Sequence, residues 1–213
     1  MKIQAFQFNP FGELTYLVWD SATCEAAVID PGMSNSAEQL TFDNFVSKNS
    51  LKLKYLLYTH LHIDHTFGHE HIVATYGLEA HAGEGDAQLG LHRAEQAEMF
   101  RLPIPKPKEL RIATPLADRQ QLSLGSESFE VIFVPGHSQG SVAFYFPESG
   151  FVITGDALFN GSIGRTDLPG GNHAQLIKSI QDRLLTLPAS TIVYPGHGPS
   201  TTIANELRYN PFL

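Results

Sequence analysis

The stretch THLHIDHTFG, at residues 59–68, carries three histidines and an aspartate within six positions, directly after the apolar run LKLKYLLY. Each of these side chains would be costly at the end of a buried strand, because an unpaired polar group taken out of water loses about 1–3 kcal/mol or more. Nitrogen and oxygen donors without thiolates suit zinc, iron or manganese. The stretch therefore indicates a metal site with the ligands His60, His62, Asp64 and His65.

Three further polar clusters also begin where an apolar run stops: PGHS after VIFV, TGDA after FVI and PGHG after IVY. They add His137, Asp156 and His197 to the candidate ligands. Strand ends lead into loops at one edge of a sheet, so the four clusters can converge although they are far apart in the chain. A hydrogen-bonded core or surface role would explain one such residue, but not four clusters at four strand ends.

Seven ligands are too many for one tetrahedral ion but suit two ions that share a bridging ligand. In an extended segment His60 and His62 point to the same side and can hold one ion. Asp64 and His65 follow after the chain turns and can hold a second. Core or surface roles are expected for His69, His71, His81 and His92, and a helix-capping role is expected for His173.

Alternating and continuous apolar runs predict strands that open as a meander and then alternate with helices. The expected strands cover residues 2–8, 13–20, 24–30, 52–59, 79–82, 120–124, 128–134, 141–146, 151–154 and 191–195. The expected helices cover residues 36–48, with Ser36 as N-cap, 67–76, 84–100 and 173–187. Two mixed sheets packed face to face with helices outside would bury these runs, whereas a doubly wound parallel sheet would not suit the hairpin-like openings.

The length of 213 residues suits one domain over residues 1–213, with an irregular helix-and-proline excursion at about 84–118. Three prolines within five residues of LPIPKPKEL forbid regular structure there, so residues 101–118 are expected to be irregular.

Charge and cysteine content exclude several classes of protein. The net charge of -8, from 22 acidic and 14 basic residues, would repel a phosphate backbone, so nucleic acid is not an expected partner. The single cysteine, Cys24, excludes an intramolecular disulfide and is expected in the core of a strand; with no secretory pattern at the N-terminus, this fits the cytoplasm. No apolar segment approaches the ~20 residues that span a bilayer, so no membrane partner is expected.

The stretch THLHIDH resembles the THxHxDH signature of the metallo-β-lactamase superfamily, and PGHS, TGDALF and PGHG match its later metal motifs in the same order. The match covers about residues 1–205. Within the superfamily, FNGSIGRTDLPGG and the ending GHGPSTTIANELRYNPFL are most similar to the compact glyoxalase II-like (hydroxyacylglutathione hydrolase) enzymes. The resemblance implies an α/β fold, a four-layer αββα sandwich of two mixed sheets flanked by helices, with metals at one edge.

The resemblance also implies roles for the candidate residues. His60, His62 and His137 would hold one ion; Asp64, His65 and His197 would hold the other; Asp156 would bridge both. Two divalent ions, zinc first and iron or manganese as alternatives, would lower the pKa of a shared water from 15.7 toward ~7. The resulting hydroxide, oriented by the catalytic Asp64, would cleave a small acyl thioester such as S-D-lactoylglutathione.

Arg165 lies where glyoxalase II enzymes carry a basic residue for the glutathione moiety, although a structural pair with Asp167 is an equal alternative. Full-length enzymes of this kind continue into a helical C-terminal domain, whereas here 16 residues follow His197. Residues 84–110 are the best candidate for a wall that replaces this domain.

The main rival function is that of the mononuclear-iron glutathione persulfide dioxygenases, which share all seven ligand positions. They typically show GCGRTD, whereas this chain has Ser162-Ile163-Gly164 before Arg165, which favours the hydrolase. A true β-lactamase is less expected, because the commonest subclass carries cysteine in place of the bridging aspartate. A nuclease is disfavoured by the acidic surface. A catalytically silent binding module would be expected to have lost metal ligands, and none is lost here. The sequence leaves open the metal, the acyl group, the thiol carrier and the oligomeric state.

Overall fold

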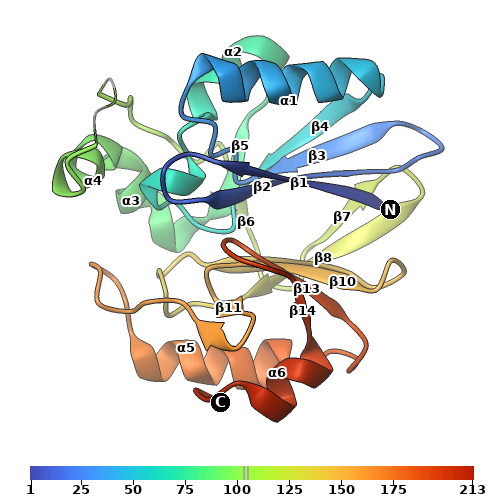
Figure 1. Cartoon of the computed structure of the whole chain (residues 1–213), viewed down its shortest axis with the longest axis vertical. Helices are drawn as coiled ribbons and strands as arrows, with labels where there is room; N and C mark the ends of the chain where they lie inside the picture. Colours follow the sequence, from blue (N-terminus) through green and yellow to red (C-terminus); the bar gives the residue numbers. More distant parts are fainter. Residues whose placement is uncertain (103, 105) are drawn as a thin grey trace.

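The computed structural model describes residues 1–102, 104 and 106–213. Two six-stranded mixed sheets pack face to face, and helices cover both outer faces (Figure 1). Helices α1 (Ser36–Lys48) and α2 (His69–Tyr76) lie on one sheet, and α5 (His173–Ser179) and α6 (Ile203–Tyr209) lie on the other. The expected four-layer αββα sandwich is confirmed.

The first sheet opens with an antiparallel meander and continues with parallel strands. Parallel neighbours need a crossover, and α1 and α2 provide the crossovers on either side of β4. In their order across the sheet, the strands are β1 (Lys2–Phe8), β2 (Glu13–Trp19), β3 (Glu25–Ile29), β4 (Lys52–Leu57), β5 (Ala80–Gly83) and β6 (Thr114–Leu116).

The second sheet is antiparallel except where β10 pairs with β13. A small separate hairpin, β11 (Leu158–Phe159) with β12 (Ser162–Ile163), follows β10. In their order across the sheet, the strands are β14 (Thr201–Thr202), β13 (Ile192–Pro195), β10 (Phe151–Gly155), β9 (Val142–Phe146), β8 (Glu127–Phe133) and β7 (Gln121–Leu124).

Three apolar layers hold the sandwich together. The middle layer lies between the sheets and contains stacked aromatic rings, such as Phe129 on Phe146 with ring centroids 4.7 Å apart. The outer layers lie under the helices, with Phe42 of α1 in one and Leu176 of α5 in the other. Full burial of such a side chain contributes about 1.5–3 kcal/mol to the stability of the fold. The packed sandwich therefore holds the ends of the loops at its edges in fixed positions.

Several local predictions were wrong. The N-cap of α1 is Asn35, whose side chain accepts hydrogen bonds from the backbone N–H groups of Ala37 and Glu38, and not Ser36. The single helix expected over 84–100 is a 3₁₀ turn, Glu84–Asp86, followed by α3 (Ala87–Leu91) and α4 (Arg93–Met99). The helix expected to reach residue 187 becomes a π-helical turn at Ile180–Leu184.

Other differences concern turns and short strands. Strand β6 lies in the stretch expected to be irregular, and Pro103 and Pro105 of the proline cluster lie outside the described residues. Cys24, expected within a strand, lies in the turn before β3 and has a left-handed φ of 59°. It is half-buried against the outer apolar layer that contains Phe42. Within the described part of the chain, no helix has the length and apolar character needed to cross a membrane.

Candidate metal centre

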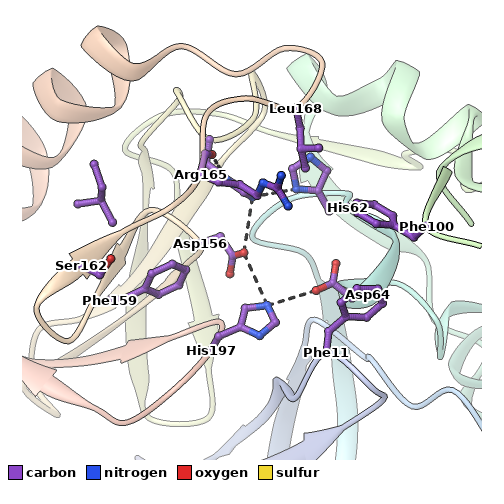
Figure 2. Close-up of a pocket in the computed structure, with 12 residues that line it drawn as sticks. Phe11, His62, Asp64, Phe100, Asp156, Phe159, Ser162, Arg165, Leu168 and His197 are labelled. Atoms are coloured by element: carbon purple, nitrogen blue, oxygen red, sulfur yellow. Dashed lines mark hydrogen bonds and ion pairs between the residues drawn. The ribbon is translucent and has the colours of Figure 1, made fainter. Parts of the chain in front are cut away.

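All seven candidate ligands lie at one edge of the sandwich, because each follows the end of a strand. His60 and His62 follow β4, and a 3₁₀ turn over Ile63–His65 then reverses the chain. The other three ligands, His137, Asp156 and His197, follow β8, β10 and β13. Figure 2 shows His62, Asp64, Asp156 and His197 facing a common space.

The first group consists of His60, His62 and His137. His137 Nε2 lies 2.8 Å from His62 Nδ1 and 3.2 Å from His60 Nε2. The outer nitrogen of His137, Nδ1, donates to the backbone oxygen of Arg165 at 2.7 Å. In the neutral ring Nε2 is then unprotonated, and its lone pair points at the other two imidazoles.

Thr59 fixes the ring of His60 in the same way. The Thr59 hydroxyl donates to Asp30 Oδ2 at 2.5 Å, so it accepts the hydrogen bond from His60 Nδ1 at 3.1 Å. His60 Nε2 therefore also presents a lone pair. Lone pairs that face each other at these distances repel unless a cation lies among them.

The second group consists of Asp64, His65 and His197. His197 Nε2 lies 3.2 Å from Asp64 Oδ2, and His65 Nε2 lies 3.7 Å from the same oxygen. His65 Nδ1 donates to Asp30 Oδ2 at 3.2 Å, so a neutral His65 presents the lone pair of Nε2 to this group.

Asp156 lies between the two groups. One of its oxygens is 3.4 Å from His65 Nε2, and the other is 3.6 Å from His137 Nε2 and 3.7 Å from His197 Nε2. His65 Nε2 and Asp156 Oδ1 are buried and have no hydrogen-bond partner among the described residues. An orphaned buried atom of this kind costs about 1–3 kcal/mol, and a divalent cation would satisfy both. The donor set therefore fits a metal of the zinc, iron or manganese type.

The pKa shifts agree with this role. Burial lowers the pKa of His62 to about 3 and holds the pKa of His60 well below its ordinary value, so both rings are neutral, as metal ligands must be. Burial alone would lower the pKa of His65 too, but Asp64 and Asp156 outweigh it and raise that pKa. The negative charges of Asp64 and Asp156 thus favour a positive charge at this position, which a bound cation would supply.

Two aspartates that support the cluster were missed by sequence reasoning. Asp30 accepts hydrogen bonds from the backbone N–H and hydroxyl of Thr59, at 2.7 and 2.5 Å, and from His65. Its sequence signal was present, since Asp30 directly follows β3 and begins the DPG turn. In the structure Asp30 has a left-handed φ of 52°.

Asp86 joins the first ligand loop to the loop of His137. It accepts from the backbone N–H of Leu61 at 3.0 Å, the hydroxyl of Ser138 at 2.8 Å and the backbone N–H of Gly140 at 2.7 Å. It lies in a stretch predicted to be a polar helix, so no local signal distinguished it.

A cavity of about 370 Å³, here called the active pocket, opens above the cluster. Figure 2 shows Phe159 on one side of Asp156, and Phe11 and Phe100 on the other. Arg165 also borders the cavity, and its guanidinium donates twice to Asp167 at 2.7 Å. Both interpretations of Arg165 therefore have a basis: it forms the structural pair and it lines the pocket.

The remaining histidines lie outside the cluster. His69 contacts the hydroxyl of Tyr58 at 2.9 Å, and His71 contacts Asp43 at 3.0 Å. His81 and His92 hydrogen-bond to backbone carbonyls. His173 starts α5, but the N-cap that satisfies the helix is Asn172, so the capping prediction was wrong.

Comparison with known proteins agrees with this geometry. Residues 9–197 match the model of the Metallo-beta-lactamase superfamily. The hydroxyacylglutathione hydrolase GloC of Haemophilus influenzae is 38% identical over 220 residues, which cover 100% of this chain and 98% of that protein.

Two solved structures are similar over nearly the full length. The BLEG-1 B3 metallo-beta-lactamase has a TM-score of 0.88 and 33% identity, covering 100% of this chain and 99% of the other. TTHA1623 in a di-iron-bound form has a TM-score of 0.86 and 38% identity, covering 99% of this chain and 100% of the other. The chain therefore belongs to the metallo-β-lactamase superfamily.

Proposed function

We propose that this chain hydrolyses a small acyl thioester such as S-D-lactoylglutathione, with two divalent metal ions held by the cluster. The observation that carries the proposal is the place of Asp156, whose oxygens lie 3.4 to 3.7 Å from imidazoles of both groups. Similarity to the relative named hydroxyacylglutathione hydrolase supports the substrate class, and similarity to a di-iron-bound structure supports two ions.

Each group would hold one ion. His60, His62 and His137 would bind the first, and Asp64, His65 and His197 the second. Asp156, which lies between the two groups, would bind both. Zinc is our first choice, with iron or manganese as alternatives, because the donors are nitrogen and oxygen. Bound divalent ions supply a water of lowered pKa and a Lewis acid for a carbonyl oxygen.

The chain's own side chains would orient the reactants. Asp64 borders the active pocket, so its carboxylate can accept a hydrogen bond from the attacking water and direct that water at the thioester. Phe11, Phe100 and Phe159 line the same cavity and would limit the access of bulk water to the reacting groups. Arg165 offers a guanidinium to a carboxylate of the thiol half.

Metal analysis combined with activity assays tests the proposal. Protein purified without chelators should contain about two metal ions per chain and hydrolyse S-D-lactoylglutathione, and a chelator should abolish this activity until metal is restored. One iron per chain, with oxygen consumption on a glutathione persulfide, would instead support the dioxygenase.

Hydrolysis of β-lactams is a second candidate, favoured by the similarity to the B3 metallo-beta-lactamase. A chromogenic cephalosporin assayed beside the thioester separates the two. We expect faster turnover of the thioester. Efficient turnover of the cephalosporin without thioesterase activity would contradict the proposal of thioester hydrolysis.

A further inference from the structure

A second cavity, of about 420 Å³, borders the same two segments of the chain as the active pocket. At the end of α4, Met99 lines the second cavity and Phe100 lines the active pocket. In the loop after β12, Leu168 lines the active pocket and Pro169 lines the second cavity. We call the second cavity the helix groove. A ligand anchored at the metal cluster can pass between these two segments and continue into the groove.

The protein itself uses several of the polar side chains around the groove. Gln139 donates from Nε2 to the backbone oxygen of Gly170 at 2.5 Å. Gln96 is buried and donates from Nε2 to two backbone carbonyl oxygens, and its Oε1 atom is buried as well. Asp86 is buried and accepts the three hydrogen bonds described above. The wall that the groove exposes is therefore almost entirely apolar.

Apolar side chains in the groove remain without cover. Met99 is 57% exposed, and the half-buried Leu89 lines the same groove. Exposed apolar surface of this kind is typical of a ligand-binding groove or an interface. Glu95 and His92 are also exposed, so their polar groups can stay in water next to a bound apolar chain. The groove thus suits an apolar occupant.

We propose that the helix groove binds the distal carbons of an unbranched acyl chain whose thioester carbonyl lies at the metal cluster. This inference rests on the thioester hydrolysis proposed above, and it extends the acyl half from small groups to medium-length chains. The acyl chain is the occupant because it is the apolar half of such a substrate. A peptide-like thiol carries charged and amide groups, which are costly to bury where few free hydrogen-bonding groups can receive them.

A series of N-acetylcysteamine thioesters tests the proposal with the metal-loaded enzyme: acetyl, butyryl, hexanoyl and octanoyl. The thiol half is constant and uncharged in this series, so differences in KM report on the acyl chain. Full burial of one CH₂ group changes an equilibrium constant by about fourfold. We expect KM to fall about ten- to fiftyfold from acetyl to octanoyl, less than full burial of every CH₂ group would give, because the groove is open on one side.

A substitution in the groove separates its contribution from that of the active pocket. Met99→Gln keeps the length of the side chain and replaces its apolar end with an amide. Leu207→Gln is the matched control, because Leu207 is 56% exposed on α6 and is not among the described residues that line either cavity. Met99→Gln should raise the ratio of KM for octanoyl to KM for acetyl about three- to tenfold. Leu207→Gln should leave this ratio as in the wild type.

Two results would overturn the groove assignment. The first is a KM ratio that Met99→Gln changes no more than Leu207→Gln does. The second is a wild type that forms a dimer in light scattering, which Met99→Gln dissociates, with a KM that does not depend on chain length. A second copy of the chain would then be the occupant of the groove.

S-D-lactoylglutathione, assayed in parallel, separates this inference from the proposed function. Hydrolysis of this thioester, with no dependence of KM on acyl chain length in the other series, would overturn the groove assignment and leave the thioesterase intact. No hydrolysis of any thioester by the metal-loaded wild type would overturn the thioesterase proposal, and the groove assignment with it.

Discussion

The floor of the active pocket and its mouth are built in opposite ways. On the floor, His137 is held by the carbonyl of Arg165, His60 by Thr59, and His65 by Asp30. These rings are almost completely buried. Each has one nitrogen bonded to the protein and the other turned to the cluster, so its orientation is determined from behind.

At the mouth, the Arg165 side chain is 54% exposed and pairs with Asp167, its one side-chain partner among the described residues. Phe11 and Phe100 meet in an edge-to-face contact with centroids 5.7 Å apart, and Phe11 is also partly exposed. An exposed ion pair such as Arg165–Asp167 contributes little to stability and can rearrange. Substitutions on the floor should therefore remove metal and activity, whereas substitutions at the mouth should change KM.

The largest effect is expected from Asp156→Ala, because the Asp156 carboxylate lies close to the inward-facing Nε2 atoms of His137 in the first group and of His65 and His197 in the second. Activity should fall by more than about a hundredfold, beyond the loss typical of residues that only support ligands. Elemental analysis should also find less metal than in Asp64→Ala, since Asp64 belongs to one group. Equal metal retention in the two variants would argue against a shared carboxylate.

A somewhat smaller effect is expected from Asp30→Asn. The amide cannot accept hydrogen bonds from Thr59 and His65 as the carboxylate does, so metal affinity measured by chelator competition should drop about ten- to a hundredfold. Asp43→Asn is the control, because Asp43 contacts His71 and Tyr76 away from the cluster. If Asp30→Asn bound metal with the affinity of the wild type, metal binding would not depend on the hydrogen bonds that Asp30 accepts.

His69 lies close to the floor and contacts Tyr58, two residues before His60. Burial, aided by the charge of Arg93, lowers its pKa to about 4. Between pH ~6.5, the ordinary pKa of histidine, and pH 4, His69 is protonated more readily in the unfolded chain than in the folded one. The contribution of His69 to the free energy of unfolding should therefore be full above pH 6.5 and decline as the pH falls below it. By pH 5 the loss should be roughly 1–2 kcal/mol.

The variant His69→Asn keeps an acceptor for Tyr58 but cannot titrate in this range. Denaturant unfolding of variant and wild type at pH 7 and pH 5 measures the difference. The variant should lose less stability on acidification, and an unchanged pH dependence would contradict the assignment.

The smallest effect is expected at the mouth. Arg165→Ala should raise KM for a glutathione thioester about three- to tenfold with little change in kcat, because an exposed charge contributes mainly uniform binding. Arg111→Ala is a matched control, since Arg111 forms a similar exposed pair with Glu109 and is not among the described residues that line the active pocket. If both variants behave alike, Arg165 is a structural residue.

Most strands could be predicted because their apolar runs are bounded by turn residues, a signal contained within a few positions. The break at His92 was not predictable in this way. Arg93, the next residue, is completely buried and donates to Thr66 and Glu70, so contacts with a distant segment determine where α4 begins. Likewise, β6 exists because it pairs with β5, which no local pattern reveals.

The sequence by itself determined the αββα architecture and identified the seven candidate ligands, because hydrophobic periodicity and polar residues at strand ends are local properties of the chain. Only the tertiary structure decided which imidazole nitrogens face inward and that Asp30 and Asp86 support the ligand loops. The tertiary structure alone also formed the active pocket, whose walls come from distant segments such as those of Phe11 and Phe159. Hydrogen-bond direction and cavity shape depend on the relative positions of such segments, and these positions exist only after packing.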